Sequence, residues 1–204
     1  MSLDLYIARH GQDEDNANGI LNGRRDTRLT ELGKRQASDL GKGMLDLNIS
    51  FDVVYSSPLD RALETAKIVS DILNIHKEPT VIEDLIERKF GVTTGKPASE
   101  IERLCSPNII KTDTITYFLD PEGAETFPQL VDRGQKVLEY VRKKSAAGSI
   151  LLVCHGDIGK LIYAAATKSY WGDVLRGFNF GNGDLIEVSN NNEVHKIKLP
   201  QHDL

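Results

Sequence analysis

Leu3-Asp4-Leu5-Tyr6-Ile7-Ala8-Arg9-His10-Gly11-Gln12 is the stretch of this sequence that decides its fold. The run is apolar and rich in strand-forming residues, and it ends abruptly at an arginine, a histidine and a glycine, which predicts a buried strand that leads into a loop. A second apolar run, 149–154, also stops at a histidine and a glycine, His155 and Gly156. Because the carboxyl ends of neighbouring parallel strands open onto one crevice, where ligands bind, we expect His10 and His155 to lie close together.

The composition indicates a single domain, 1–204, that folds alone. The chain has 204 residues, of which 40% are hydrophobic, and this length suffices for a sizeable core. Its 25 basic and 30 acidic residues give a formal net charge of −5, so no basic field attracts nucleic acid or an anionic membrane. We therefore expect neither as a partner, and we expect a local cluster of arginine and histidine to hold any anionic ligand.

The cysteines and the apolar runs favour a cytoplasmic location. Cys105 and Cys154 make neither a disulfide framework nor a metal-binding spacing, which fits a reducing compartment. The first apolar run is too short for a signal sequence, and no run reaches the roughly 18 residues that a membrane span requires. Cys154 adjoins His155, but adjacent strand residues point to opposite faces, so we expect its thiol to pack in the core rather than act as a nucleophile.

Strand and helix patterns alternate along the chain. Strands are predicted at 51–55, 80–82 and 149–154, with a terminal edge hairpin at 185–188 and 194–197. Helices are predicted at 30–47 with Thr30 as N-cap, from Pro58 to about 73 with Ser57 as N-cap, at 99–104, after 123–126 to about 146 with Gly148 as C-cap, at 158–166 and at 171–175. The alternation predicts an α/β fold, a three-layer sandwich whose mostly parallel mixed sheet carries helices on both faces.

The segment from about 92 to 122 has a weaker pattern than the rest of the chain. Glycine and proline interrupt it, and we interpret it as a lid-like insertion over the crevice. Arg103 and Lys111 are its candidates for contacting the part of a substrate beyond the phosphate.

Several short motifs together resemble those of a known family. Arg9-His10-Gly11, Ser57-Pro58-Leu59-Asp60-Arg61, Glu87-Arg88-Lys89-Phe90-Gly91 and His155-Gly156 are similar, in this order, to the motifs of the histidine phosphatase superfamily, the phosphoglycerate mutase-like branch 1. The match runs along nearly the whole chain. The resemblance implies a small phosphorylated substrate, no cofactor or metal, and a possible homodimer.

A phosphoryl group carries charge on three oxygens, so an enzyme that moves it needs fixed cations and a group that meets the phosphorus. Arg9 and Arg61 suit this task, because a guanidinium bonds two phosphate oxygens and stays charged at any working pH. The resemblance implies that His10 is the nucleophile that forms a phosphohistidine, and that His155 stabilises charge on the transferring oxygens.

Glu87 is, by the same resemblance, the acid that protonates the leaving alkoxide and then the base that activates water. For this role the pKa of its carboxyl must be raised by a desolvated site or by a nearby negative charge. Arg88 and Lys89 would have the opposite effect if they pointed inward, so the sequence leaves the matter open.

The resemblance also implies a set of substrate-binding positions: Gln12, Asn16, Gly23, Arg24, Arg88 and Gly156. The chain departs from the family at Asp13, where threonine is common, and Asp13-Glu14-Asp15 puts three carboxylates beside the expected phosphate site. Two interpretations are open. The three residues form either a solvated loop or an acidic rim that disfavours multiply charged substrates such as bisphosphates.

The resemblance implies a phosphomonoester hydrolase that acts through a phosphohistidine on a small phosphorylated metabolite. A 2,3-bisphosphoglycerate-dependent phosphoglycerate mutase is one alternative, but the segment between Glu87 and Gly123 is short compared with the mutases, which favours hydrolysis. A non-catalytic phospho-ligand binding domain is the other, and the presence of all five catalytic candidates disfavours it. We interpret the remaining histidines, His76, His195 and His202, as solvated surface.

Overall fold

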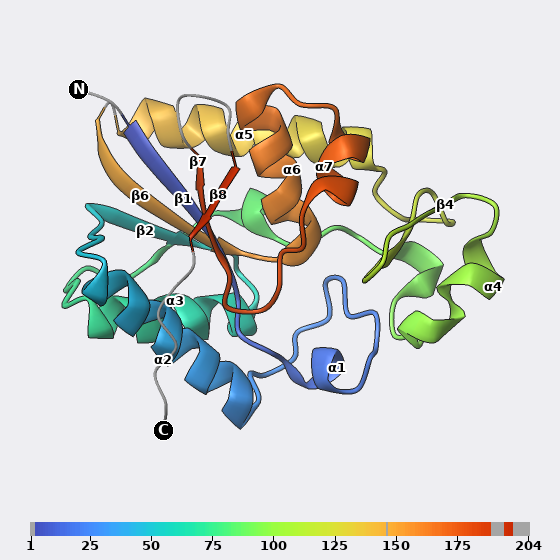
Figure 1. Ribbon diagram of the computed structural model, residues 1–204, viewed down its shortest axis with the longest axis horizontal. Helices are drawn as coiled ribbons and strands as arrows, with labels where there is room; N and C mark the ends of the chain where they lie inside the picture. Colours follow the sequence, from blue (N-terminus) through green and yellow to red (C-terminus); the bar gives the residue numbers. More distant parts are fainter. Residues whose placement is uncertain (1–2, 146, 189–193, 198–204) are drawn as a thin grey trace.

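The two strands that end in histidine lie side by side at the centre of the sheet (Figure 1). In the computed structural model, which describes residues 3–145, 147–188 and 194–197, β1 (Leu3–Arg9) pairs in parallel with β6 (Gly148–Cys154). The register sets Arg9 opposite Cys154, so the two strands end at the same edge of the sheet. The predicted meeting of the two strand ends is confirmed.

In the part of the chain that the structure describes, the main sheet has six strands in the order β3-β2-β6-β1-β7-β8. Four of them, β3 (Thr80–Val81), β2 (Val53–Ser56), β6 and β1, run parallel. β7 (Leu185–Val188) and β8 (Val194–Ile197) are antiparallel and form the predicted edge hairpin. The bend at 190–192, the side chain of His195 and all of His202 lie outside the described residues.

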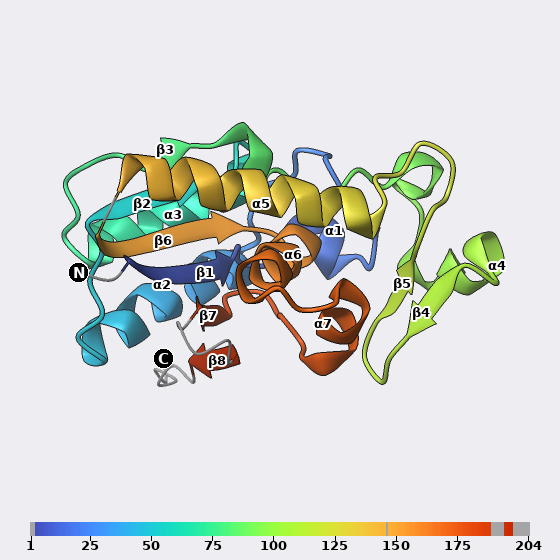
Figure 2. The ribbon, with the colours of Figure 1, turned by 90° about the horizontal axis from the view of Figure 1, so that it is seen from above.

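Helices cover both faces of this sheet (Figure 2). α5 (Phe127–Lys144) and α6 (Gly156–Thr167) pack on one face, and α2 (Glu31–Asp46) and α3 (Asp60–Ile72) on the other. Alternate strand residues point to opposite faces, so Leu152 and Cys154 join the core under α5 and α6, whereas Leu151 and Val153 join the core under α2 and α3. The predicted mostly parallel α/β sandwich is confirmed. The Cys154 thiol is buried, as predicted, and this burial raises its pKa.

Two predicted helix ends are wrong, and the prediction of Thr30 as N-cap of α2 is confirmed. Ser57 does not cap α3, which begins at Asp60 after Leu59. Its hydroxyl accepts from the amide of Leu59 at 3.3 Å, before the helix begins, and contacts His155. Gly148 does not cap α5, which ends at Lys144 where Ser145 turns to extended backbone; Gly148 is instead the first residue of β6.

The remaining elements lie outside the main sheet. They are α1 (Glu14–Ala17), α4 (Ile101–Cys105), α7 (Trp171–Gly177), the antiparallel pair β4 (Ile109–Lys111) and β5 (Thr116–Phe118), and short 3₁₀ helices at Glu83–Leu85, Gly91–Thr93 and Ala98–Glu100. The pair β4–β5, which the sequence pattern did not predict, lies with α4 at one end of the molecule, away from the main sheet (Figure 1). Phe90, Ile101 and Phe118 form a small core that attaches it. Its action as a lid stays a prediction. None of the described helices has both the length and the apolar composition needed to cross a membrane.

We predict that Gly33→Ala destabilises the protein although alanine is favoured over glycine in a free helix by about 1 kcal/mol. Gly11 and Gly33 pack back to back, and a Cβ at Gly33 would overlap the main-chain carbonyl oxygen of Gln12. The backbone must shift, which should lower the free energy of unfolding in urea by about 2 kcal/mol or more. Gly177→Ala is the control, since a Cβ there meets nothing within 4 Å. A Gly33→Ala variant as stable as the control would contradict the close approach.

Candidate active site

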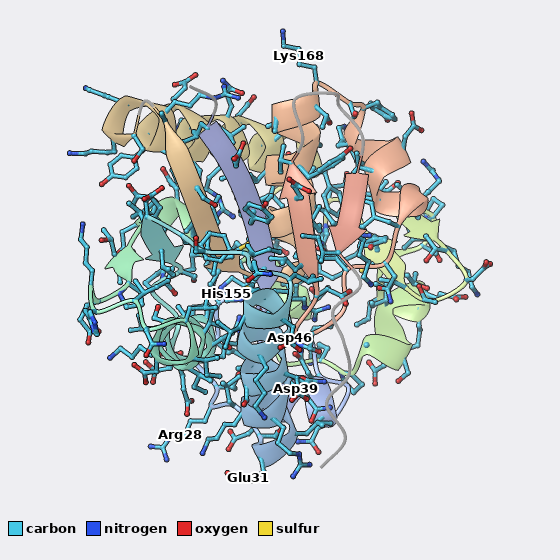
Figure 3. The ribbon with its side chains drawn as sticks, turned by 60° about the vertical axis from the view of Figure 1, so that its left-hand side comes forward. Arg28, Glu31, Asp39, Asp46, His155 and Lys168 are labelled. Carbon is cyan, nitrogen blue, oxygen red and sulfur yellow. The ribbon has the colours of Figure 1, made fainter. Side chains whose placement is uncertain are left out.

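His10 and His155 face each other where β1 and β6 end. The amide of His10 donates to the carbonyl of Cys154 at 3.0 Å, and His155 precedes α6 as its N-cap (Figure 3). The centroids of the two imidazole rings are 4.9 Å apart, and both side chains are buried. The parallel pairing of two distant segments thus brings the two predicted histidines into one site.

Arg61 lies between the two imidazoles. It comes from the first turn of α3 and is fully buried. Its Nε is 3.2 Å from Nε2 of His10 and 3.2 Å from Nδ1 of His155. Its Nη1 donates to the carbonyl of Arg25 at 2.6 Å and its Nη2 to that of Gly23 at 2.8 Å. Gly23, predicted to bind substrate, therefore fixes Arg61 through its main chain.

The hydrogen bonds decide where each imidazole carries its proton. Nδ1 of His10 is 2.6 Å from the carbonyl of Gly11, which only accepts, so Nδ1 carries the proton and Nε2 keeps a free lone pair. His155 is the reverse: its Nδ1 accepts from Arg61, and its Nε2 is 2.7 Å from the hydroxyl of Ser57. Burial, followed by the charge of Arg61, lowers the pKa of both histidines well below the usual value, so both rings are neutral at pH 7.

The side chain of Glu87 is buried, with 5% of its surface exposed, and lies against the first residues of α6. Its Oε1 accepts from the amides of Arg88 at 2.7 Å and Ile158 at 3.1 Å, and its Oε2 from that of Asp157 at 3.2 Å. Burial and then the charge of Asp157 raise its pKa, while these three amides act in the opposite direction. The side chain of Lys89 is exposed and that of Arg88 pairs with Asp157, so neither opposes the raised pKa in the way the sequence left open.

A cavity of about 540 Å³ adjoins this cluster. Arg9, Glu87 and Gly156 line one side, and residues of the β4–β5 hairpin line the other. Arg9 donates through Nη1 to the carbonyl of Phe180 at 2.7 Å, and its buried Nε has no hydrogen-bond partner among the described residues. A Cβ at position 156 would touch the Arg9 guanidinium at 3.5 Å, so glycine leaves room beside this cation.

The other predicted substrate-binding residues have different positions. Asn16 lines the cavity. Arg24 donates through Nε to the main-chain carbonyl of Glu87 at 3.0 Å, and the side-chain oxygen of Gln12 accepts from the hydroxyl of Thr30 at 2.9 Å. Gln12 and Arg24 do not line the cavity. Direct contact of either side chain with substrate stays a prediction.

Arg88 lines the cavity, but its guanidinium is used within the protein. It donates to Asp157 at 2.7 Å and to the carbonyls of Glu125 and Phe118, each at 3.1 Å, and it lies over the ring of Phe118 at 4.2 Å. Arg103 and Lys111 pair with nearby glutamates and do not line the cavity. The structure therefore places none of these three cations free beside a substrate.

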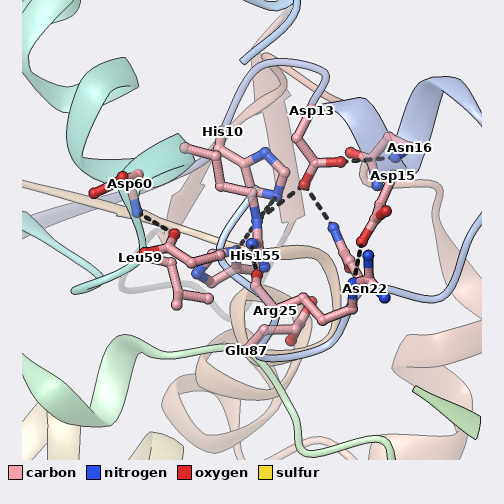
Figure 4. Close-up of polar contacts among 12 residues, drawn as sticks. His10, Asp13, Asp15, Asn16, Asn22, Arg25, Leu59, Asp60, Glu87 and His155 are labelled. Atoms are coloured by element: carbon pink, nitrogen blue, oxygen red, sulfur yellow. Dashed lines mark hydrogen bonds and ion pairs between the residues drawn. The ribbon is translucent and has the colours of Figure 1, made fainter. Parts of the chain in front are cut away.

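Both interpretations of the acidic stretch 13–15 need correction. Asp13 and Asp15 are buried rather than solvated, and only Glu14 is exposed. Asp15 forms an ion pair with Arg25 at 2.9 Å (Figure 4). Asp13 forms one with Arg61 at 3.1 Å. The carboxylates of Asp13 and Asp15 therefore stabilise the site from within and do not form a rim around it.

Four contributors to the site were missed in the sequence. Ser57 orients His155, and Asn182 donates to the carbonyl of His10 at 3.1 Å and to the side chain of Asn16 at 3.0 Å. Glu125 and Arg133 pair at 2.7 Å, and Arg133 also donates to the carbonyl of Glu87 at 3.4 Å. Asn182 lies in a Gly-Asn-Gly turn, which indicates only a loop, and Arg133 interrupts the apolar face of a helix, a signal that could have found it.

The site lies at one edge of a parallel sheet and contains two neutral imidazoles, two arginines and a buried glutamate. In an α/β protein, this set of side chains suits the binding of a phosphoryl group. The sequence comparison narrows this class: residues 5–201 match the histidine phosphatase superfamily (branch 1), and the chain belongs to that superfamily. No group of three or more His, Cys, Asp or Glu side chains that could hold a metal ion occurs within the described ranges.

Relatives include both mutases and phosphatases. The chain is 27% identical over 190 residues to a 2,3-bisphosphoglycerate-dependent phosphoglycerate mutase of Mesorhizobium japonicum, covering 90% of each chain. It is 29% identical over 196 residues to the uncharacterized phosphatase PhoE of Bacillus subtilis, covering 95% of this chain and 92% of that protein. A phosphoserine phosphatase of Entamoeba histolytica, solved with 3-phosphoglyceric acid, shares the fold with a TM-score of 0.76 at 24% identity, covering 98% of each chain.

We predict that the imidazole protons can be observed by ¹⁵N NMR of the labelled protein. Between about pH 5.5 and 8, where a free histidine titrates, His10 should stay neutral with its proton on Nδ1, and His155 neutral with its proton on Nε2. Ser57→Ala should change the signals of His155 more than those of His10, because Ser57 contacts only the His155 ring. A second proton on either ring within this range would contradict the assignment.

Proposed function

We propose that this chain is a phosphomonoesterase that transfers the phosphoryl group first to Nε2 of His10 and then to water. The observation that carries the proposal is the fixed tautomer of His10. Its Nδ1 is held by the Gly11 carbonyl, and the lone pair of its Nε2 is directed at the cation of Arg61. A nucleophile oriented in this way, beside two arginines, suits attack on phosphorus.

In the first step the phosphate enters beside Arg9, whose Nε lacks a hydrogen-bond partner. A phosphoryl oxygen then replaces the two imidazoles as acceptor of the hydrogen bond from Nε of Arg61. The ester enters as its monoanion, and its phosphoryl proton passes to Nδ1 of His155, whose pKa the negative charge of the phosphate raises. Nδ1 then donates this proton in a hydrogen bond to a phosphoryl oxygen. Nε2 of His10 then bonds to phosphorus as the bond to the ester oxygen breaks. Arg9, Arg61 and His155 stabilise the negative charge that develops on the phosphoryl oxygens, and they need not move to do so.

Glu87 gives its proton to the leaving alkoxide and, as a carboxylate, then takes one from the water that attacks the phosphohistidine. Its raised pKa supports the first role, since it keeps part of the carboxyl protonated at higher pH than usual. The product phosphate forms as the bond between phosphorus and Nε2 of His10 breaks, and it leaves as a monoanion with the proton of His155. His10 and His155 are then neutral and Glu87 is protonated, as at the start.

The wall of the cavity supports an uncharged alcohol as the rest of the substrate. Besides Arg9, the cations that line the described wall are Arg88 and Lys160, and both are used within the protein. Lys160 donates to the hydroxyl of Tyr117 at 2.9 Å and to the carbonyls of Leu175 and Phe178, and burial lowers its pKa to about 8. The apolar part of the wall includes Ile20, Leu21, Phe90, Ile101, Ile115 and Phe118.

Phosphoglycerate mutase is the second candidate, because relatives that cover most of the chain carry that name. A mutase must hold the carboxylate of the glycerate and a second phosphate position. The shortage of uncommitted cations in the described wall therefore favours hydrolysis over mutase activity.

We predict that the protein releases phosphate from butyl phosphate with a higher kcat/KM than from 3-phosphoglycerate, because a carboxylate finds no free cation in the cavity. With 3-phosphoglycerate, with or without 2,3-bisphosphoglycerate, free phosphate should form without 2-phosphoglycerate. His10→Ala should abolish both phosphate release and the acid-labile phosphoprotein. Bisphosphate-dependent interconversion would make the protein a mutase. If the wild type neither hydrolyses nor interconverts any ester, a binding role replaces the proposal.

We also predict that Glu87→Gln lowers kcat/KM for butyl phosphate by about 10²–10⁴, the usual contribution of a general acid. Turnover of 2,4-dinitrophenyl phosphate should change far less when phosphorylation of His10 is followed in a single turnover, because its leaving group departs without a proton. In the wild type the rate with butyl phosphate should fall as the pH rises through the raised pKa of Glu87. Asp157→Asn removes a charge that raises this pKa, so it should move the fall to lower pH. Equal losses with both esters would exclude Glu87 as the acid.

A further inference from the structure

Asp13 is the one carboxylate that forms an ion pair with Arg61 in the described structure. It is fully buried, and its Oδ2 is 3.1 Å from Nε of Arg61. The same oxygen accepts from Asn22 at 2.6 Å (Figure 4). Its Oδ1 accepts from the amide of Asn16 at 2.7 Å and so caps α1. The Nε–H of Arg61 donates to His10 and His155, and the carboxylate of Asp13 lies beside the same nitrogen as its ion-pair partner.

Only one of these contacts needs a negative charge. Serine, threonine and asparagine cap a helix about as well as aspartate, and Asn22 needs only an acceptor. A carboxylate removed from water is costly unless a cation compensates it. The negative charge of Asp13 is therefore explained by its ion pair with Arg61, and not by its role as the N-cap of α1.

The same charge acts on a phosphate. Before phosphate enters, the two histidines are neutral, so Arg9 and Arg61 are the cations that first meet it, and Asp13 offsets one of them. The Nε of Arg61 that Asp13 contacts is also the atom nearest to the nucleophile, at 3.2 Å from Nε2 of His10. A phosphoryl oxygen that bonds this nitrogen competes directly with the carboxylate.

We propose that Asp13 is an internal counter-anion that competes with the phosphoryl group for Arg61, and that it thereby keeps the affinity for inorganic phosphate low and speeds release of the product. This proposal rests on the proposed function, because it takes the site to be the one that binds the phosphoryl group. Asp13 acts through Arg61 and does not itself react, so it is a positioning residue.

The test is the affinity for inorganic phosphate, measured by titration calorimetry at fixed ionic strength and checked with vanadate. Asp13→Asn and Asp13→Ser both keep the cap and remove the charge, and each should tighten phosphate binding by about 10²–10³-fold, as expected for one unit charge about 4–6 Å away at an effective dielectric constant near 20. In turnover of butyl phosphate the variants should show a lower KM and stronger inhibition by phosphate. Damage to the structure would weaken binding, so the direction of the change separates the two causes.

Glu14→Gln is the matched control. It removes the same charge from the neighbouring residue, which is exposed and has no contact with Arg61, and should change the affinity less than twofold. Unchanged or weaker binding by folded Asp13 variants would overturn the proposal, as would equal tightening by Glu14→Gln. If neither Asp13 variant folds, the charge is structural and the proposal is wrong. If the wild type itself binds no phosphate, the proposed function fails with it, whereas wild-type binding that the variants do not improve overturns this inference alone.

Discussion

The buried guanidinium of Arg61 connects the parts of the chain that make the site. It is carried by α3, it bonds the loop that follows β1 through the carbonyls of Gly23 and Arg25, and it reaches both histidines through Nε. A buried cation must have its donors satisfied, so the surrounding loop can take few other conformations. The position of His10, the shape of the loop and the start of α3 therefore depend on one another.

The glutamate is fixed by a second arrangement of the same kind. The amides at the start of α6 hold the carboxylate of Glu87, and Arg24 and Arg133 hold its main-chain carbonyl from two other elements. Helix N-termini favour negative charge, yet burial and Asp157 act against it. The opposing effects leave a carboxyl that either gains or loses a proton readily, which a group acting first as acid and then as base requires.

The sequence is most informative where the pattern is local. An apolar run that stops at histidine is visible in either strand alone, and parallel pairing then brings His10 and His155 together, so the centre of the site was predictable. The side-chain partners were not. Ser57 has the sequence context of a helix cap but bonds a histidine 98 positions away, and Asp13 has the context of a polar loop but lies buried against Arg61. The strands β4 and β5, three residues each, are too short to give a periodic signal.

The central place of β1 has a consequence for how the protein is made. β1 is the first element of the chain, yet its neighbours in the sheet, β6 and β7, come near its end, and Leu3 pairs with Gly148. A ribosome that adds about 5–20 residues per second needs roughly 7–30 s to supply that partner. Until then an apolar strand with unpaired edges is exposed in the nascent chain, so the segment that leads to His10 is open to pairing with other chains during synthesis.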